Sequence, residues 1–276
     1  MAGSETGQMA PAVAGELETL GWHAGDPEVR EVVPAVLRGT SAVVHLPPAP
    51  AWASPLAAAL LAGLAERPGR VLVLAAPVLI NEWALVFTAL ARGTALRIEA
   101  ARGPARAART LAAGDVDVLI ASPATALALH GRSALAPDRI TTLVLAWPET
   151  WDSDAGLAGI APDLPRDAQR LLITARPDLL GGSDGLIERY LRKALVLGGS
   201  AAGEPAGPVR TMATPWHSRA GTVATLIEAL DPPAVTVWTA DTRDHATLAQ
   251  TLGRGGDTVT IVARATPAAG TTTICY

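Results

Sequence analysis

The chain reads Ser41-Ala-Val-Val-His-Leu-Pro-Pro-Ala-Pro-Ala-Trp-Ala-Ser-Pro-Leu56 where its first apolar run meets a proline-rich loop. The run 42–44 predicts a buried strand, and 55–66 predicts an Ala/Leu-rich helix with a proline in its first turn. Strand, loop and helix at this spacing form the frame of a phosphate-binding loop. A working loop of that kind needs glycines, a lysine and a Ser or Thr for the metal. Residues 47–53 contain prolines but no glycine and no lysine, and the only lysine of the chain is Lys193. The frame therefore indicates a nucleotide-driven fold that has lost its phosphate chemistry.

Composition narrows the class of protein. The chain has 276 residues, 49% of them hydrophobic and 17% charged, which is enough apolar material for one large or two modest domains. A net charge of −4 argues against a broadly basic nucleic-acid binder. The single cysteine, Cys275, excludes an internal disulfide and fits a reducing compartment, so we expect a cytoplasmic protein. The apolar stretches are too short and too broken for a bilayer span, and no signal peptide is evident.

Strand and helix patterns alternate along most of the chain. We expect strands at 42–45, 70–75, 95–100, 117–121, 142–146 and 170–174, and helices at 26–38, 55–66, 79–92, 103–113, 123–130, 155–161 and 184–192. Val/Leu/Ile-rich strands separated by helices of this length are typical of a parallel sheet covered on both faces. The predicted fold class is therefore α/β.

The domain boundaries follow from composition. We expect residues 1–15 to be disordered, 16–198 to form the main domain and 199–215, rich in glycine and proline, to be a linker. Residues 216–276 then hold two further helices and short strands. This tail is well below the usual size of a complete domain.

Further motifs lie on both sides of the loop. No single one of them is specific, but their order and spacing along the chain form a pattern. They are Leu20-Gly21-Trp22, Ala76-Pro77-Val-Leu-Ile-Asn-Glu82, Ala101-Arg102-Gly103-Pro104, Val118-Leu-Ile-Ala-Ser122-Pro123, Thr142-Leu-Val-Leu-Ala146-Trp147-Pro148-Glu149 and Leu171-Leu-Ile-Thr174-Ala175-Arg176. In order and spacing, residues 20–197 resemble the first RecA-like domain of a DEAD-box RNA helicase. The resemblance implies a RecA-like parallel sheet sandwiched by helices, of the P-loop NTPase type, followed by a truncated second RecA-like lobe at 216–276.

The resemblance also places the nucleotide-contacting positions of that family on residues of the wrong chemical type. The phosphate-binding Lys aligns with Trp52, the metal-binding Ser/Thr with Ala53, the Mg²⁺ carboxylate with Ala146, the water-activating Glu with Trp147 and the adenine-reading Gln with Val29. The other positions in these altered motifs are Pro47, Pro48, Ala49, Glu149, Thr174 and Arg176. Each charge-assisted contact is worth about 1.5–3 kcal/mol, so several losses together remove useful affinity. We therefore expect no ATP hydrolysis, no catalytic residue, no cofactor and no metal.

The two tryptophans at these positions have two interpretations. Trp52 and Trp147 are expected to follow adjacent strands at their carboxyl ends, where open α/β folds bind ligands. Their rings either fill the vacated nucleotide pocket or lie on the surface.

Candidate nucleic-acid contacts lie around the third and fourth predicted strands. Arg102, Arg106 and Arg109 cluster near one helix, and the Ser122 hydroxyl can donate to a phosphate. The alternative is a solvated helix face beside Asp115 and Asp117.

Other side chains contribute little to a prediction of function. The histidines His23, His45, His130, His217 and His245 show no metal-ligand spacing. Trp216 and Trp151 stand in polar surroundings and are the better candidates for an aromatic that faces a partner.

The sequence thus predicts a catalytically inactive DEAD-box helicase-like protein that serves as a binding or scaffolding subunit. A protein partner or a homo-oligomer is expected because the short second lobe would expose strand edges and apolar surface. RNA is a second candidate partner, and no membrane is expected. The alternative function is an unusual ATP-dependent RNA helicase or ATPase, using ATP and Mg²⁺, whose site another chain completes. A chain that folds but has no selected activity is the third alternative.

Overall fold

The computed structural model describes residues 11–66, 68–114, 116–176, 185–191, 193–198, 212–239, 242–252, 259–263 and 272–276. The chain divides into two compact units, Met1–Ala202 and Gly203–Tyr276. Each unit is described by itself.

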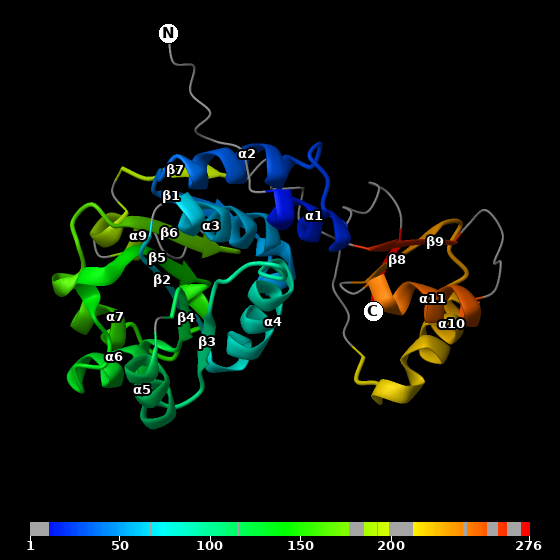
Figure 1. Ribbon diagram of the computed structural model, residues 1–276. Coiled ribbons are helices and arrows are strands. Elements are labelled where there is room, and N and C mark those ends of the chain that lie inside the picture. Colours follow the sequence, from blue (N-terminus) through cyan, green and yellow to red (C-terminus); the bar gives the residue numbers. More distant parts are fainter. Residues whose placement is uncertain are drawn as a thin grey trace, which may run out of the picture. The chain divides into compact units, whose positions relative to one another are not determined.

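The first unit is built on a seven-stranded sheet in which every neighbouring pair is parallel (Figure 1). Its strands are β1 (Ala42–His45), β2 (Arg70–Leu74), β3 (Ile98–Ala101), β4 (Val118–Ala121), β5 (Ile140–Ala146), β6 (Gln169–Thr174) and β7 (Leu195–Leu197). They lie in the order β3-β4-β2-β5-β6-β1-β7. The central strands are Val/Leu/Ile runs because both of their faces are buried.

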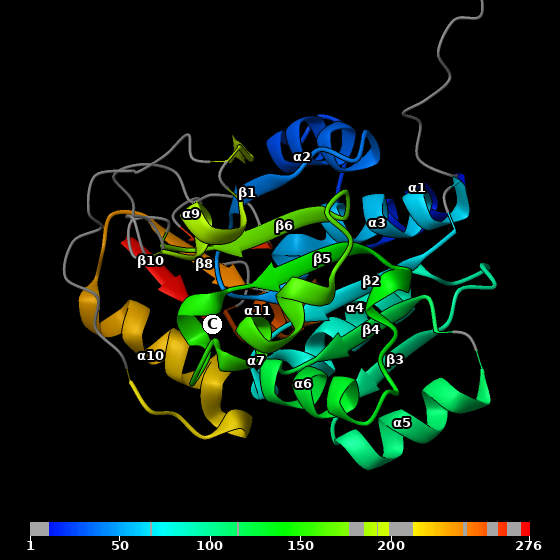
Figure 2. The ribbon, with the colours of Figure 1, turned by 90° about the vertical axis from the view of Figure 1, so that its left-hand side faces the viewer.

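Helices cover both faces of this sheet (Figure 2). One face packs against α1 (Pro11–Thr19), α2 (Pro27–Leu37), α3 (Ser54–Glu66) and α4 (Ile80–Leu90), and the other against α5 (Pro104–Ala113), α6 (Pro123–Gly131), α7 (Ala155–Ile160) and α9 (Leu186–Tyr190). Successive strand residues alternate between the two cores: Val73 and Val144 belong to the first, Leu72 and Leu145 to the second. The predicted α/β class, with a parallel sheet between two helical layers, is confirmed.

The second unit has a three-stranded parallel sheet. Its strands β8 (Val235–Thr239), β9 (Val259–Ala263) and β10 (Thr272–Cys275) lie in the order β10-β8-β9. Two helices, α10 (Arg219–Leu230) and α11 (Thr242–Leu252), share a small core with the sheet. Val223, Val235, Val237 and Leu248 are its buried members.

Several sequence predictions differ from the structure. Helix α1 begins at Pro11, so the prediction of disorder was wrong for residues 11–15, and residues 1–10 lie outside the described residues. The predicted linker also lies outside them, except for 212–215. Strand β3 begins at Ile98 and not at Ala95, because the Thr94 hydroxyl bonds to the carbonyl of Ala91 and accepts from the N–H of Leu96, which holds that segment in a turn. Strand β7 was not predicted.

Candidate nucleotide site at the carboxyl edge of the large sheet

The loop that stands in for a phosphate-binding loop connects β1 to α3. Pro47 and Pro48 are exposed, and the chain then forms a short 3-10 turn, Pro50–Ala53, that runs directly into α3. The N–H of Ala49 donates to the carbonyl oxygen of Pro47 at 2.8 Å, and the N–H of Trp52 donates to that of Ala49 at 2.9 Å. Prolines have no N–H to offer, and these two N–H groups are used inside the loop. The prolines and these two internal bonds therefore reduce the number of amides that the loop can offer to a phosphate.

Trp147 follows β5 and is completely buried. Its indole Nε1 donates to the carbonyl oxygen of Leu46, the residue before the proline loop, at 3.0 Å. Its ring lies 5.6 Å from the ring of Trp83 on α4, at an interplanar angle of 35°. The backbone of Trp147 is left-handed, with φ 47° and ψ 64°, which is unusual for a bulky residue. The Trp147 ring thus lies in the core beneath the loop, and the alternative that it lies on the surface is wrong.

Trp52 is only half-buried. Its ring meets Trp22, from the turn between α1 and α2, in an edge-to-face contact with centroids 6.0 Å apart. Val29 on α2 packs against the same core as Trp52 and Trp147. Val29, Trp52 and Trp147, which align with nucleotide-contacting positions of the helicase family, therefore belong to one apolar cluster.

Glu149 lies in the turn after β5 and ties that strand to the end of β6. Its Oε1 accepts from the Thr174 hydroxyl at 3.0 Å and from the N–H of Ala175 at 2.7 Å. The N–H of Arg176 donates to the same Thr174 hydroxyl at 2.9 Å, and His45 Nε2 lies 2.9 Å from the carbonyl oxygen of Ala175. Oε2 of Glu149 is buried without a hydrogen-bond partner among the described residues. The structure thus brings the predicted positions Glu149, Thr174 and Arg176 together.

The residues at this edge do not fit a Mg²⁺–nucleotide complex. Ala53 and Ala146, which align with the family's metal-binding positions, are fully buried. Lys193 precedes β7, whose first residue pairs with the first residue of β1, so the lysine lies at the amino edge of the sheet. The proline loop follows the last residue of β1 at the opposite edge. Across the described ranges, no three His, Cys, Asp or Glu side chains gather as a metal site would require.

Of the candidate nucleic-acid-binding residues, the three arginines are exposed and Ser122 is buried. Arg106 and Arg109 are exposed on α5, and Arg102 is exposed just before it, with Nε donating to Oδ1 of Asn81 at 2.7 Å. Ser122, by contrast, caps α6 and is 8% exposed. Its hydroxyl accepts from the N–H of Thr125 at 3.1 Å and lies 3.0 Å from the Thr125 hydroxyl, so its hydrogen-bonding capacity serves the helix. The sequence signal for this cap was Ser-Pro with a hydroxyl at the third helical position.

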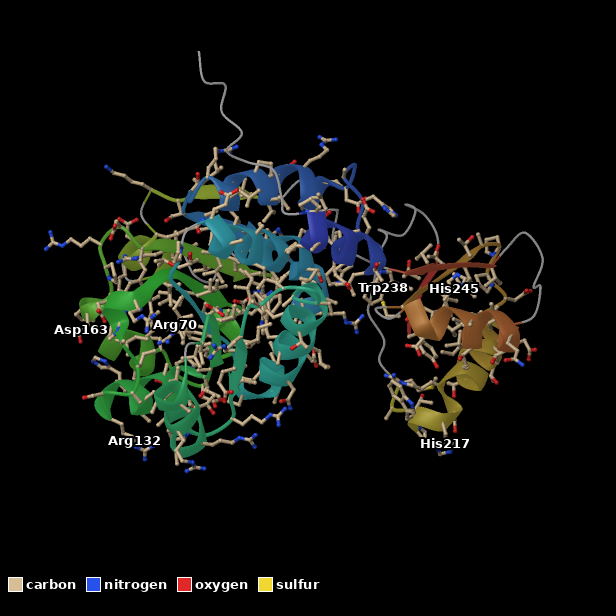
Figure 3. The ribbon with its side chains drawn as sticks, in the orientation of Figure 1. Arg70, Arg132, Asp163, His217, Trp238 and His245 are labelled. Atoms are coloured by element: carbon tan, nitrogen blue, oxygen red, sulfur yellow. The ribbon has the colours of Figure 1, made fainter. Side chains whose placement is uncertain are left out.

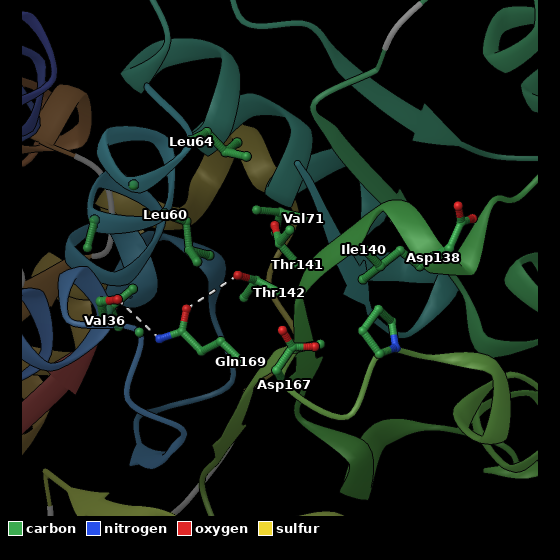
Figure 4. Close-up of a pocket in the computed structure, with 15 residues that line it drawn as sticks. Val36, Leu60, Leu64, Val71, Asp138, Ile140, Thr141, Thr142, Asp167 and Gln169 are labelled. Carbon is green, nitrogen blue, oxygen red and sulfur yellow. Dashed lines mark hydrogen bonds between the residues drawn. The ribbon is translucent and has the colours of Figure 1, made fainter. Parts of the chain in front are cut away.

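A cavity that the sequence analysis missed lies at the amino edge (Figure 4). It has a volume of about 300 Å³ and is lined by α2, α3 and the beginnings of β2, β5 and β6. Gln169 spans its wall: Nε2 donates to the carbonyl oxygens of Val36 at 3.1 Å and Thr40 at 2.9 Å. Its Oε1 accepts from the Thr142 hydroxyl at 3.3 Å. These bonds satisfy the buried amide, which therefore holds structure together.

The two tryptophans predicted to face a partner differ in exposure. Trp151 is half-buried and its Nε1 donates to the carbonyl oxygen of Ala146 at 3.1 Å, so its surroundings are less polar than expected. Trp216 is 72% exposed.

Three chains of DEAD-box proteins are among the solved structures that are similar to this chain. A DEAD box protein from Methanococcus jannaschii superposes with a TM-score of 0.59 at 15% identity, covering 89% of this chain and 68% of that chain. A Saccharomyces cerevisiae Dbp5 variant bound to Nup159, a Gle1 variant, IP6 and ADP gives 0.56 at 12% identity, covering 93% and 76%. A second Dbp5 complex, with Gle1 and IP6, gives 0.54 at 12% identity, covering 90% and 64%. No family model and no curated protein sequence matches the chain. The RecA-like fold that the sequence resemblance implied is confirmed.

None of the helices that the structure describes combines the length and the apolar character of a membrane-crossing helix.

Proposed function

We propose that this chain is a catalytically inactive DEAD-box helicase-like protein that acts as a binding or scaffolding subunit for a protein partner, an RNA or both. The observation that carries the proposal is Trp147. Its buried ring and its hydrogen bond to Leu46 occupy the end of β5, where the resemblance places two carboxylates. Trp147 then closes the vacated pocket, and Trp52 covers it from the loop side.

Magnitudes favour a closed site. Removing a buried Trp ring from a core costs about 3–5 kcal/mol. A nucleotide with millimolar affinity supplies only about 4 kcal/mol of binding free energy. A nucleotide that had to displace Trp147 would also lack the lysine and the metal carboxylate, so no binding is expected at millimolar concentration.

Titration calorimetry with Mg²⁺-ATP and Mg²⁺-ADP tests the proposal directly. We expect no heat beyond dilution up to millimolar nucleotide, with a thermal unfolding transition as the control that the protein is folded. Micromolar binding of either nucleotide would overturn the inactive assignment.

A second function has one observation in its favour. Oε2 of Glu149 lies buried without a hydrogen-bond partner among the described residues, beside Thr174. In an ATPase or helicase that a partner chain completes, this oxygen would accept from a ligand once the partner had opened the edge. ATP hydrolysis by such a complex, abolished by Glu149→Gln, would favour this alternative. Hydrolysis that survives Glu149→Gln would assign the activity to the partner.

The binding role requires a partner-facing surface. Val78, in the 3-10 turn before α4, and Leu85, in α4, are 79% and 71% exposed and are candidates for such a surface. One Dbp5 neighbour is a complex with Nup159 and Gle1 and the other is a complex with Gle1, which is a property of those proteins. A concentration series in light scattering checks for a homo-oligomer. Salt-dependent binding of single-stranded RNA, weakened by Arg106→Gln and Arg109→Gln together, would support the RNA role.

A further inference from the structure

The second unit carries a cluster of two aromatic rings around one arginine, in which Trp216 is exposed and Arg219 and Tyr276 are half-buried. The guanidinium of Arg219 lies 4.5 Å from the ring centroid of Trp216 and 5.6 Å from that of Tyr276. Both distances fall within the range of cation–π attraction. We call Trp216, Arg219 and Tyr276 the aromatic–arginine cluster. Its exposed neighbour His217 projects at the beginning of α10 (Figure 3).

The cluster lies where parallel sheets bind ligands. Tyr276 directly follows β10, and its N–H donates to the carbonyl oxygen of Trp238 near the end of β8 at 2.8 Å. Tyr276 therefore lies at the carboxyl edge of the small sheet. Arg219, the first residue of α10, contacts its ring, and Trp216 lies in the 3-10 turn before that helix. In open α/β folds this edge is the usual ligand-binding side.

The side chains of the cluster have unused binding capacity. Within the part of the chain that the structure describes, Arg219 forms no ion pair and contacts the two rings. A guanidinium presents five N–H donors, and cation–π contact leaves them available. Trp216 is 72% exposed, so the face of its ring opposite Arg219 is open. The stacking also holds Arg219 in place, which lowers the entropy that binding would cost.

We propose that the aromatic–arginine cluster binds a nucleotide unit, with the base on the open face of Trp216 and the phosphate on Arg219. A nucleotide supplies a flat π ring and a phosphate within one residue, which matches both groups of the cluster. An acidic peptide segment supplies the anion but no ring fixed beside it. The same chemistry comes from single-stranded RNA or from a free nucleotide. This inference rests on the second unit alone and does not depend on whether the first unit hydrolyses ATP.

Fluorescence anisotropy of a labelled oligouridylate at low salt, with the full chain, tests the inference. Trp216→Ala removes one base–aromatic stack and is expected to weaken binding about 5- to 100-fold. Arg219→Gln should weaken it comparably and lower the dependence of affinity on salt. Leu230→Ala, at the far end of α10 and 55% exposed, is the matched control and should leave the affinity unchanged.

A second readout locates the site independently of contacts on the first unit. A 4-thiouridine oligonucleotide should cross-link to the peptide that contains Trp216. Equal binding by wild type, Trp216→Ala and Arg219→Gln, no binding at low salt, or competition by poly-glutamate that matches competition by oligouridylate would each overturn the inference. Competition by UMP as strong as by the oligomer would identify a free nucleotide as the source, and much weaker competition would identify RNA.

Discussion

The two edges of the large sheet are formed by the same strands, yet they use their space in opposite ways. At the carboxyl edge, the Trp147 ring lies fully inside the core and its indole bonds to Leu46. At the amino edge, a cavity of about 300 Å³ remains open beside the hydrogen-bonded amide of Gln169 (Figure 4). The carboxyl edge, at which open α/β folds bind ligands, is filled by the Trp147 ring. At the amino edge, the Gln169 side chain forms hydrogen bonds beside a cavity that stays empty of side chains.

This contrast shows that a buried polar group and a buried ring stabilise an α/β edge differently. The Gln169 amide joins β6 to the end of α2 through two directional bonds. The Trp147 ring contributes mainly apolar area and contact with Trp83, plus one hydrogen bond. Substitutions that remove each group measure the difference.

Trp147→Ala is expected to have the largest effect. The substitution removes a fully buried ring and leaves a cavity, so the free energy of unfolding should fall by about 3–5 kcal/mol. Urea denaturation followed by circular dichroism measures it, with the exposed Trp216→Ala as the control, expected within about 0.5 kcal/mol of wild type. A loss below about 1 kcal/mol would contradict the closed carboxyl edge.

Gln169→Ala should rank second. The substitution leaves the carbonyl groups of Val36 and Thr40 without this donor and the Thr142 hydroxyl without its acceptor, at a cost of about 1–3 kcal/mol. The same denaturation assay applies. Thr141→Ala, an exposed neighbour on the wall of the cavity, is the matched control. Equal effects of the two substitutions would show that the Gln169 bonds do not hold the amino edge.

Trp52→Ala is expected to have the smallest effect of the three. The ring is half-buried and loses one edge-to-face contact with Trp22, so we expect about 1–2 kcal/mol. A change in the free energy of unfolding below about 0.5 kcal/mol would show that Trp52 does not help to close the pocket and that Trp147 alone fills it.

Much of the first unit could be predicted from sequence because the pattern is local. Runs such as 71–74 and 118–120 are apolar throughout, as fully buried parallel strands must be. Strand β7 was missed because its three residues offer too short a pattern. Its position is determined by pairing with β1, far away in the sequence.

The sequence predicted where along the fold the residues of the candidate site lie, but not which residues they contact. The motif order correctly indicated that Trp147 follows β5. The prediction that Trp52 and Trp147 follow adjacent strands was wrong, because β6 lies between β1 and β5 and pairs with both. The bond from the Trp147 indole to Leu46 joins residues 101 positions apart. The contact between Glu149 and Thr174 is likewise long-range. Gln169 was overlooked because a single polar residue at the start of an apolar strand does not reveal that its partners lie on α2 and β5. Ser122 could have been recognised as a helix cap from Pro123 and Thr125 alone.

The contact between the Trp83 and Trp147 rings has a spectroscopic consequence. Two indole rings 5.6 Å apart and inclined by 35° have strongly interacting transition dipoles, and both are shielded from water. Their coupled bands in circular dichroism and a blue-shifted emission would disappear together if the carboxyl edge opened. The chain therefore carries an intrinsic optical reporter at the carboxyl edge of the large sheet, the side at which open α/β folds bind ligands, and it needs no added label.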